Sequence, residues 1–122
     1  QQPIPADAIA VHGIMDEMVA DAPSFDAVRK QVCDLLSHRP AVMYNAEFDT
    51  AFLRNEGVSI YEPYCLMRKF AIWRGERSGK HTYRWQSLGM ACQLMDITFQ
   101  PHRALADADA ARRLLLKLAE VI

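Results

Sequence analysis

The sequence has few cysteines, and their spacing matches no common kind of site. Cys33, Cys65 and Cys92 are odd in number and widely spaced, with no CxxC pair and no histidine at the spacing of a zinc site. This pattern argues against a disulfide framework and against structural zinc. It predicts a reduced, intracellular protein whose thiols are structural.

Long apolar runs and a strong net charge are also missing. No apolar stretch approaches the roughly 20 residues that span a bilayer, and no basic segment followed by an apolar one opens the chain. The formal net charge is −1, so the overall field does not indicate a nucleic-acid or membrane partner. We expect a soluble, cytoplasmic protein with no membrane partner.

The chain contains no internal repeat, low-complexity segment or linker. Its 122 residues, 51% of them hydrophobic, suit one domain that spans residues 1–122. The opening "QQPIPADAIAV" has no methionine and carries two prolines in its first five residues, as a loop cut from a longer protein would. We therefore expect a partial domain.

Hydrophobic periodicity and turn residues predict an α/β chain that is rich in helices. Residues 1–23 have the composition of a loop with one short helix within 15–21. Longer helices are expected over 24–38, 45–57 and 85–95 and from about 103 to the end, and strands over 41–44 and 64–66. The strand "AVMY" runs into a helix through a short polar junction, which is where α/β folds place their chemistry.

One carboxylate of the last helix lies on the face that should be buried. The helical spacing puts six residues on one stripe: Asp107, Ala111, Leu114, Leu115, Leu118 and Ile122. Burial of an ionised carboxylate without a partner costs several kcal/mol. A cation is one partner that would satisfy Asp107, and a partly exposed position favoured by the helix dipole is the alternative.

Asp109 provides a comparison on the same helix. Arg112 and Arg113 follow it by three and four residues, so ordinary surface ion pairs explain this carboxylate. His102 precedes Asp107 by five residues, and the two side chains can converge only if His102 lies in the loop marked by Pro101.

A second carboxylate stands at a similar place. Asp49 begins the helix that follows "AVMYN". Two aspartates from two helix starts can hold part of a Mg²⁺ site, because Mg²⁺ takes oxygen ligands and keeps several waters. The alternative for Asp49 alone is a helix-start carboxylate with no other role.

Three segments resemble, in order, the DEDDh class of 3'-5' exonucleases, relatives of the proofreading subunit of bacterial DNA polymerase III and of exonuclease X. "IPADAIAVHGIMDEMVADAPSF" is similar to the stretch before the first large helix of that family, "VMYNAEFDTAFL" to its second motif and "HRALADADAA" to its third. The resemblance covers nearly the whole chain. It implies that Asp49 and Asp107 are metal ligands and that His102 is the general base.

The resemblance also implies a fold and a reaction. The fold would be ribonuclease H-like, truncated here to a helix-rich C-terminal part with about two strands. The reaction would be hydrolysis of terminal phosphodiesters of DNA or RNA to nucleoside 5'-monophosphates, with two divalent cations, Mg²⁺ or Mn²⁺, in the intact site. His102 would take a proton from the attacking water, a task that suits histidine because imidazole exchanges protons near neutral pH.

Two departures from the family pattern affect these expectations. Tyr44-Asn45 replaces the His-Asn of many members, and the Asp-x-Glu of the first motif is absent. Half of the expected carboxylates are therefore missing. We expect weak metal binding and no activity from this chain unless the missing segment is supplied.

The expected substrate is the single-stranded 3' end of a nucleic acid. The resemblance places His12, Tyr44, Asn45 and Phe48 around its terminal nucleotide. Residues 68–84 contain six Lys or Arg against one Glu, an excess of five positive charges, interleaved with Phe70, Trp73 and Tyr83. Such a segment can follow a phosphate backbone and stack a base, or it can be a solvated basic loop with core aromatics.

Two other functions remain open. The chain could belong to a catalytically inactive relative that binds nucleic acid or a polymerase. It could also be an interaction module that pairs with another chain, such as a second copy of itself.

Overall fold

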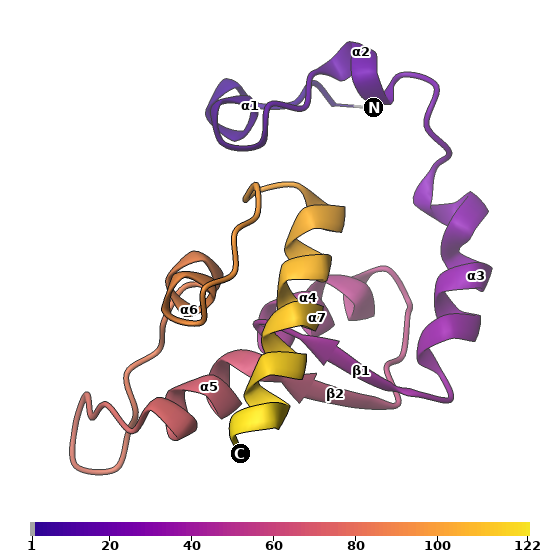
Figure 1. Cartoon of the computed structure of the whole chain (residues 1–122). Coiled ribbons are helices and arrows are strands. Elements are labelled where there is room, and N and C mark those ends of the chain that lie inside the picture. The colour runs from indigo at the N-terminus through magenta and orange to yellow at the C-terminus, as the bar shows by residue number, and fades with distance from the viewer. Residues whose placement is uncertain (1) are drawn as a thin grey trace.

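The computed structural model describes residues 2–122 as a helix-rich α/β chain. The elements are, in order, α1 (Ala6–His12), α2 (Asp16–Val19), α3 (Phe25–Leu36), β1 (Pro40–Met43), α4 (Ala46–Asn55), β2 (Glu62–Cys65), α5 (Leu66–Arg74), α6 (Leu88–Leu94) and α7 (Ala104–Val121). Their course is shown in Figure 1. The predicted class, a ribonuclease H-like fold reduced to a helix-rich part with about two strands, is confirmed.

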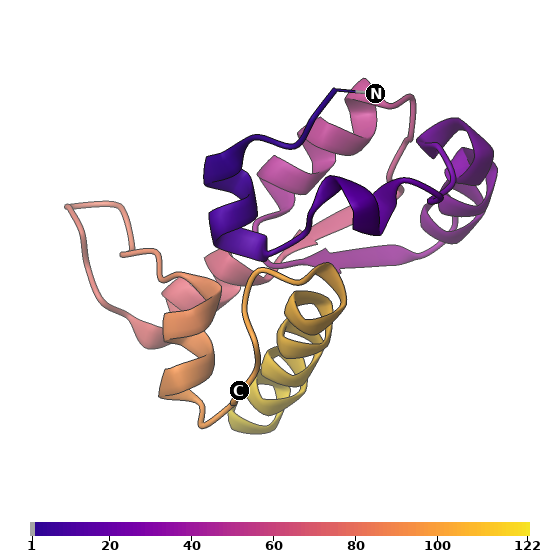
Figure 2. The same cartoon turned by 90° about the horizontal axis from the view of Figure 1, so that it is seen from above.

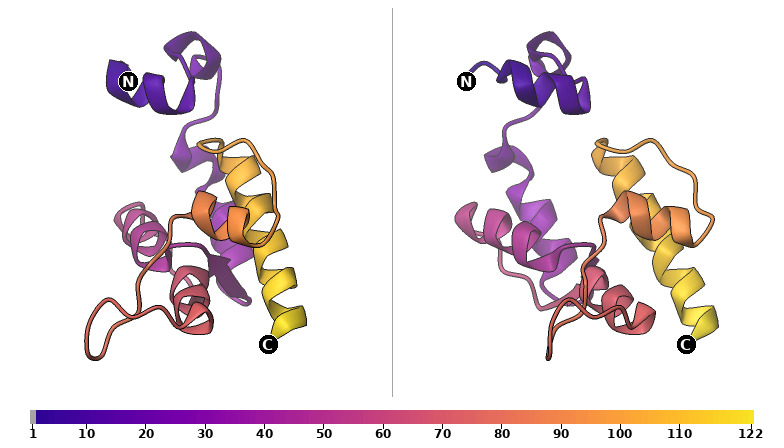
Figure 3. Two further views of the ribbon diagram at one scale, coloured as in Figure 1. Left: turned by 60° about the vertical axis from the view of Figure 1, so that its left-hand side comes forward. Right: turned by 90° about the vertical axis from the view of Figure 1, so that its left-hand side faces the viewer.

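The two strands form a parallel pair, with Pro40 opposite Glu62 and Met43 opposite Cys65. Parallel strands need a crossover, and α4 supplies it between β1 and β2. Figure 2 shows α4 on one face of this small sheet and α7 on the other, and the right-hand view of Figure 3 shows the same arrangement. The sheet is thus the middle layer between two helices.

The core lies mainly among α5, α6 and α7. Its buried side chains are Leu66, Phe70, Ala91, Cys92, Ile97, Ala110, Ala111, Leu114 and Leu118. The predicted inward stripe of the last helix is confirmed at Ala111, Leu114 and Leu118, while Leu115 is partly buried. Ile122 is exposed because the helix ends at Val121.

The burial pattern of α7 gives a stability prediction with a matched control. Leu114 is 0% exposed and Leu116, two residues further on, is 52% exposed. Leu114→Ala should lower the free energy of unfolding by about 2–5 kcal/mol, because it leaves a cavity in the core. Leu116→Ala should cost less than about 1 kcal/mol. Urea denaturation of both variants measures the difference, and similar losses would contradict this packing.

Several predicted elements are confirmed with small shifts at their ends. Helices occur where 24–38 and 45–57 predicted them, and α2 lies within the short helix expected at 15–21. Gly57 follows α4 with a φ of 75°, a left-handed conformation that glycine adopts without strain. Gly57 therefore marks the end of this helix close to the predicted boundary at residue 57.

Two predicted elements are wrong in part. Residues 6–12 form α1 although a loop was expected, because three alanines follow Pro5 and give this stretch high helix propensity. The helix expected from Trp85 begins only at Leu88, because Ser87 caps it: the Ser87 Oγ accepts from the Met90 N–H at 3.1 Å. Trp85 is consequently not a core residue.

The apolar residues at helical spacing in α4 do not form its buried face. Phe48, Ala51 and Phe52 are exposed, and the buried residues of the helix are Ala46 and Thr50. The sheet that α4 covers has only two strands, so the helix has little surface against which to pack.

Within the part of the chain that the structure describes, no helix is both long enough and apolar enough to cross a membrane.

Candidate active site

The junction between β1 and α4 fixes Tyr44 firmly. The half-buried Tyr44 hydroxyl donates to the Gln86 carbonyl at 2.7 Å, and the Tyr44 carbonyl accepts from the Met67 N–H at 2.8 Å. Burial raises the pKa of the Tyr44 phenol, with smaller contributions from Cys92 and Cys65. The phenol therefore stays neutral and acts as a hydrogen-bond donor.

Asp49 lies in the first turn of α4, one turn after Asn45. It is half buried, and burial raises the pKa of its carboxyl above the ordinary aspartate value. Asn45 is exposed and its side chain makes no capping bond. Phe48 is exposed as well, and its ring centroid lies 5.5 Å from that of Phe52. Asn45 and Phe48 are therefore available to a ligand.

His102 and Asp107 meet directly. His102 lies in the loop before α7, and its backbone N–H donates to the Asp107 Oδ1 at 3.2 Å. The φ of His102 is 64°, a left-handed conformation that non-glycine residues adopt rarely. This conformation turns the backbone N–H of the loop toward the first turn of the helix, while the exposed imidazole makes no hydrogen bond to residues 2–122. The structure thus confirms that the pair converges only through the loop.

His12 ends α1 close to the same loop. Its Nδ1 accepts from the Ile14 N–H at 2.9 Å, so the turn after α1 orients the ring. A Cβ atom on the next residue, Gly13, would lie 3.6 Å from the Arg103 guanidinium. The turn after α1 is therefore within reach of the side chain of Arg103, the residue before α7. This proximity brings together two segments that are about 90 residues apart in the sequence.

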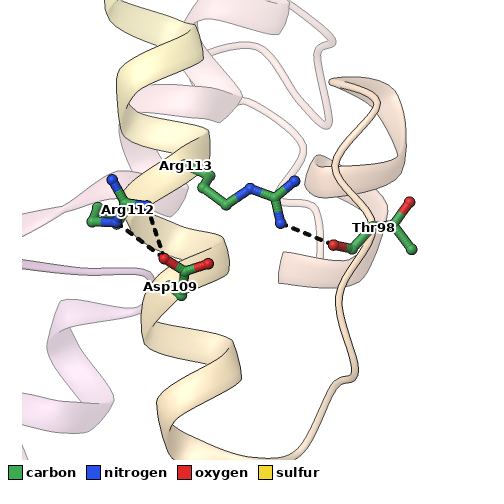
Figure 4. Close-up of polar contacts among 4 residues, drawn as sticks. All are labelled: Thr98, Asp109, Arg112 and Arg113. Carbon is green, nitrogen blue, oxygen red and sulfur yellow. Dashed lines mark hydrogen bonds and ion pairs between the residues drawn. The ribbon is translucent and has the colours of Figure 1, made fainter.

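The two arginines after Asp109 behave differently, as Figure 4 shows. Arg112 donates to the Asp109 Oδ1 through Nε at 3.0 Å and through Nη2 at 2.9 Å, which confirms an ordinary surface ion pair. The predicted partner Arg113 is wrong, because its Nη1 donates to the Thr98 carbonyl at 2.9 Å. Arg113 instead fixes the connection between α6 and α7.

Residues 2–122 do not by themselves form a complete cation site. Within residues 2–122, no three side chains of His, Cys, Asp or Glu gather into a group that could hold a metal ion. Asp49 and Asp107 come from helices on opposite faces of the sheet (Figure 2). Two separate carboxylates fall short of the oxygen ligands that a Mg²⁺ pair needs.

No sequence pattern indicated which residue holds Tyr44. Gln86 is 42 positions further along the chain and acts through its backbone carbonyl. Helical or strand periodicity carries no information about such a contact, since any residue type offers the same carbonyl.

The environment of Asp49 gives a prediction for stability in the presence of a chelator. Because the pKa of Asp49 is higher in the folded than in the unfolded state, ionisation of this carboxyl opposes folding. The free energy of unfolding therefore falls as the pH rises from the unfolded-state pKa through the folded-state pKa. Asp49→Asn should therefore raise the free energy of unfolding at about pH 7, by up to about 1 kcal/mol because water screens a half-buried group. The gain should vanish at about pH 3, below the ordinary aspartate pKa, where the carboxyl is protonated in both the folded and the unfolded state.

Thermal unfolding at the two pH values measures this effect. Asp21→Asn, a change at an exposed carboxylate between α2 and α3, is the control and should have no effect. A loss of stability in Asp49→Asn would show that a partner in the fold stabilises the carboxylate.

Comparison with known proteins gives one family model and several relatives. The model, described as "Exonuclease" and designated RNase_T, matches residues 1–115. The chain is 35% identical to the uncharacterized exonuclease CP81 of Escherichia phage 186, over 87% of the chain and 62% of that protein. It is 44% identical to the DNA polymerase III subunit epsilon of Pasteurella multocida, over 45% of the chain and 22% of the subunit.

A third relative, the PolC-type DNA polymerase III of Bacillus cereus, is 30% identical over 96% of the chain and 8% of that protein. The chain thus spans less than two thirds of the length of these relatives. No solved structure matches the chain significantly.

Proposed function

Because this chain belongs to the exonuclease family, we propose that it contributes two parts of the active site of a metal-dependent 3'-5' exonuclease of the DEDDh class. The enzyme would remove nucleoside 5'-monophosphates from the single-stranded 3' end of DNA or RNA. The observation that carries the proposal is the hydrogen bond from His102 to Asp107, which holds the proposed base beside the proposed metal ligand.

Asp49 and Asp107 are the proposed cation ligands of this chain. Each stands in the first turn of a helix and is half buried, so each carboxylate is supported on one side and open on the other. Divalent cations in such enzymes activate a water and stabilise the leaving oxygen. Since the described residues form no cation cluster, we propose that further carboxylates complete the site and that residues 1–122 alone are inactive.

His102 is the proposed general base. Its imidazole is exposed, and its own backbone N–H, rather than the ring, makes the bond to Asp107. In the reaction an imidazole nitrogen accepts a proton from the attacking water as the water oxygen bonds to phosphorus. The bond from phosphorus to the 3' oxygen of the preceding nucleotide breaks, and that oxygen takes up a proton from solvent.

Four residues are proposed to hold the terminal nucleotide. Exposed Phe48 offers a ring face for stacking, and Asn45 offers an amide that makes no capping bond. Tyr44 is held by its bond to the Gln86 carbonyl, and the turn after α1 orients the ring of His12. These features support contacts to a base and a sugar at the junction of β1 and α4.

The experiment follows nucleotide release from single-stranded oligonucleotides labelled at either end. The 122-residue chain and the longest in-frame protein that contains it would be incubated with Mn²⁺ or with a chelator. The proposal expects Mn²⁺-dependent shortening from the 3' end by the longer protein and none by the short chain. Shortening from the 5' end, or activity that survives the chelator, would contradict it.

A second candidate is a catalytically inactive module that binds nucleic acid or a polymerase. It is favoured by one observation, the lack of a cation cluster among residues 2–122. Two relatives are named as DNA polymerase III proteins. Binding of an oligonucleotide or a polymerase by the longer protein, without nucleotide release under any divalent cation, would select this candidate.

A further inference from the structure

The connection between α5 and α6 is an ordered hairpin rather than a loose loop. Arg77 and Tyr83 form an antiparallel bridge, the Ser78 N–H donates to the Thr82 carbonyl at 3.1 Å, and the Arg84 N–H donates to the Glu76 carbonyl at 2.8 Å. We call residues 76–84 the basic hairpin. It projects away from the other elements in Figures 1 and 3.

An open groove of about 710 Å³ separates the basic hairpin from α5. Its lining includes Arg68 and Ile72 of α5, His81, Tyr83 and Arg84 of the hairpin, and Trp85. Cationic groups and aromatic rings therefore line the same hollow. This combination suits a flexible anion that also carries flat rings.

Most of the cations in residues 68–84, of which Arg68 and Arg84 line the groove, have no carboxylate partner. Arg68 pairs with Glu47 at 3.3 Å and Arg74 with Glu76 at 3.6 Å. Across residues 2–122, no carboxylate lies within ion-pair distance of the other four: Lys69, Arg77, Lys80 and Arg84. The positive charge of this segment is thus available to an external anion, although the chain as a whole is nearly neutral.

The aromatic side chains of the segment divide into core and surface. Phe70 is fully buried, and the Trp73 ring packs on it with centroids 5.5 Å apart. The Arg77 guanidinium covers one face of Tyr83 at 4.5 Å. Trp85, next to Arg84, is 60% exposed and offers a free ring face to a ligand.

The groove is connected to the candidate active site through Tyr44. The Tyr44 hydroxyl donates to the carbonyl of Gln86, the residue after Trp85. This bond fixes the end of the groove to the junction of β1 and α4, where Asp49 begins its helix.

We propose that this groove binds the single strand behind its 3' end, with Lys80 and Arg84 on phosphates and Trp85 stacked on a base. The inference rests on the proposed exonuclease function and names the path of its substrate. A strand lies with its last nucleotide at Tyr44 and Phe48 and its preceding nucleotides along the basic hairpin. Stacking and phosphate contacts are insensitive to sequence, so any single strand binds.

The first test removes the charge. Binding of a fluorescent oligothymidylate of about 20 nucleotides would be measured by anisotropy, with chelator, at several salt concentrations, in the longest in-frame protein that contains the chain. Lys80→Ser with Arg84→Ser should weaken binding at least about fivefold and reduce the salt slope by about 1.4, because each phosphate contact contributes about 0.7 for single strands.

The matched control is Lys30→Ser with Arg39→Ser, which removes two exposed cations outside the groove. It should leave the affinity and the salt slope unchanged. Equal effects of the two double variants would overturn the proposal, because they would show attraction by total charge alone.

The second test removes the stacking surface. Trp85→Ala should weaken binding by about 5- to 150-fold and leave the salt slope unchanged, since a stacked base contributes no counterion release. Tyr61→Ala is the control, because Tyr61 is 61% exposed and lies outside the groove. A Trp85 variant that binds as tightly as the control would overturn the proposal.

The chelator separates this inference from the proposed reaction. If the parent protein cleaves normally and the groove variants bind the oligonucleotide as tightly as the parent, the proposed strand path is wrong and the proposed reaction stands. Groove-dependent binding without any cation-dependent cleavage would overturn the reaction and leave the strand path standing.

Discussion

Asp107→Asn is expected to lower the rate of cation-dependent nucleotide release by about 10²- to 10⁴-fold, since a lost cation ligand removes several kcal/mol of transition-state stabilisation. Asparagine keeps an oxygen that can accept the His102 N–H, so the loop geometry should survive. The measurement is the single-turnover rate in the longest in-frame protein that contains this chain. Circular dichroism would verify that the fold is intact.

Asp109→Asn is the matched control for this variant. Asp109 lies two residues further along the same helix, and its exposed carboxylate pairs with Arg112 at 2.9 Å. The loss of such a surface pair costs little, so the rate should stay within about twofold of the parent. If the Asp109 variant lost as much activity as the Asp107 variant, the specific role of Asp107 would be wrong.

His102→Asn should reduce the same rate by about 10²- to 10⁴-fold, the usual contribution of a general base. Asparagine is the better replacement than alanine here, because the φ of His102 is 64° and asparagine tolerates this left-handed conformation. Substrate affinity should change little, since only the proton acceptor is lost.

His38→Asn is the control for His102. His38 is exposed and lies between α3 and β1, away from the proposed site. This variant should release nucleotides at the parent rate. Equal rates for the parent and His102→Asn would remove His102 from the mechanism.

Where the sequence predicted the fold correctly, local signals and packing agreed. The α7 stripe was readable because Leu114 and Leu118 recur at helical spacing and are buried against α5 and α6. The stop after α4 was readable because a glycine is needed at the left-handed position of Gly57. In both cases a single backbone or packing requirement determines which residue type stands at the position.

The errors have a common physical cause. A local sequence pattern does not show which surface or group of the folded chain a side chain will contact. Phe48 and Phe52 have helical spacing, yet they are exposed because α4 covers only a two-stranded sheet. Trp85 has the spacing of a helical core residue, yet Ser87 starts the helix after it. Arg113 stands at ion-pair spacing from Asp109, yet a carbonyl of the preceding connection binds it.

The candidate site was predictable only in pieces. The loop position of His102 followed from Pro101 and from the angle between residues 102 and 107, and the structure confirms it. The roles of Asp49, His102 and Asp107 remain predictions. The link from Tyr44 to Gln86 could not be predicted, because backbone carbonyls leave no signature in a sequence.

The bonds that α7 makes to the connection before it limit how far His102 can travel. The Lys117 Nζ donates to the Met95 carbonyl at 2.6 Å, and the Arg113 Nη1 donates to the Thr98 carbonyl at 2.9 Å. If the bond between His102 and Asp107 breaks, only Phe99, Gln100 and Pro101 separate the histidine from its anchored neighbour. Such a tether, four Cα–Cα steps long, extends at most about 14 Å. The segment is therefore too short to open as a lid, and it keeps His102 next to the first turn of α7.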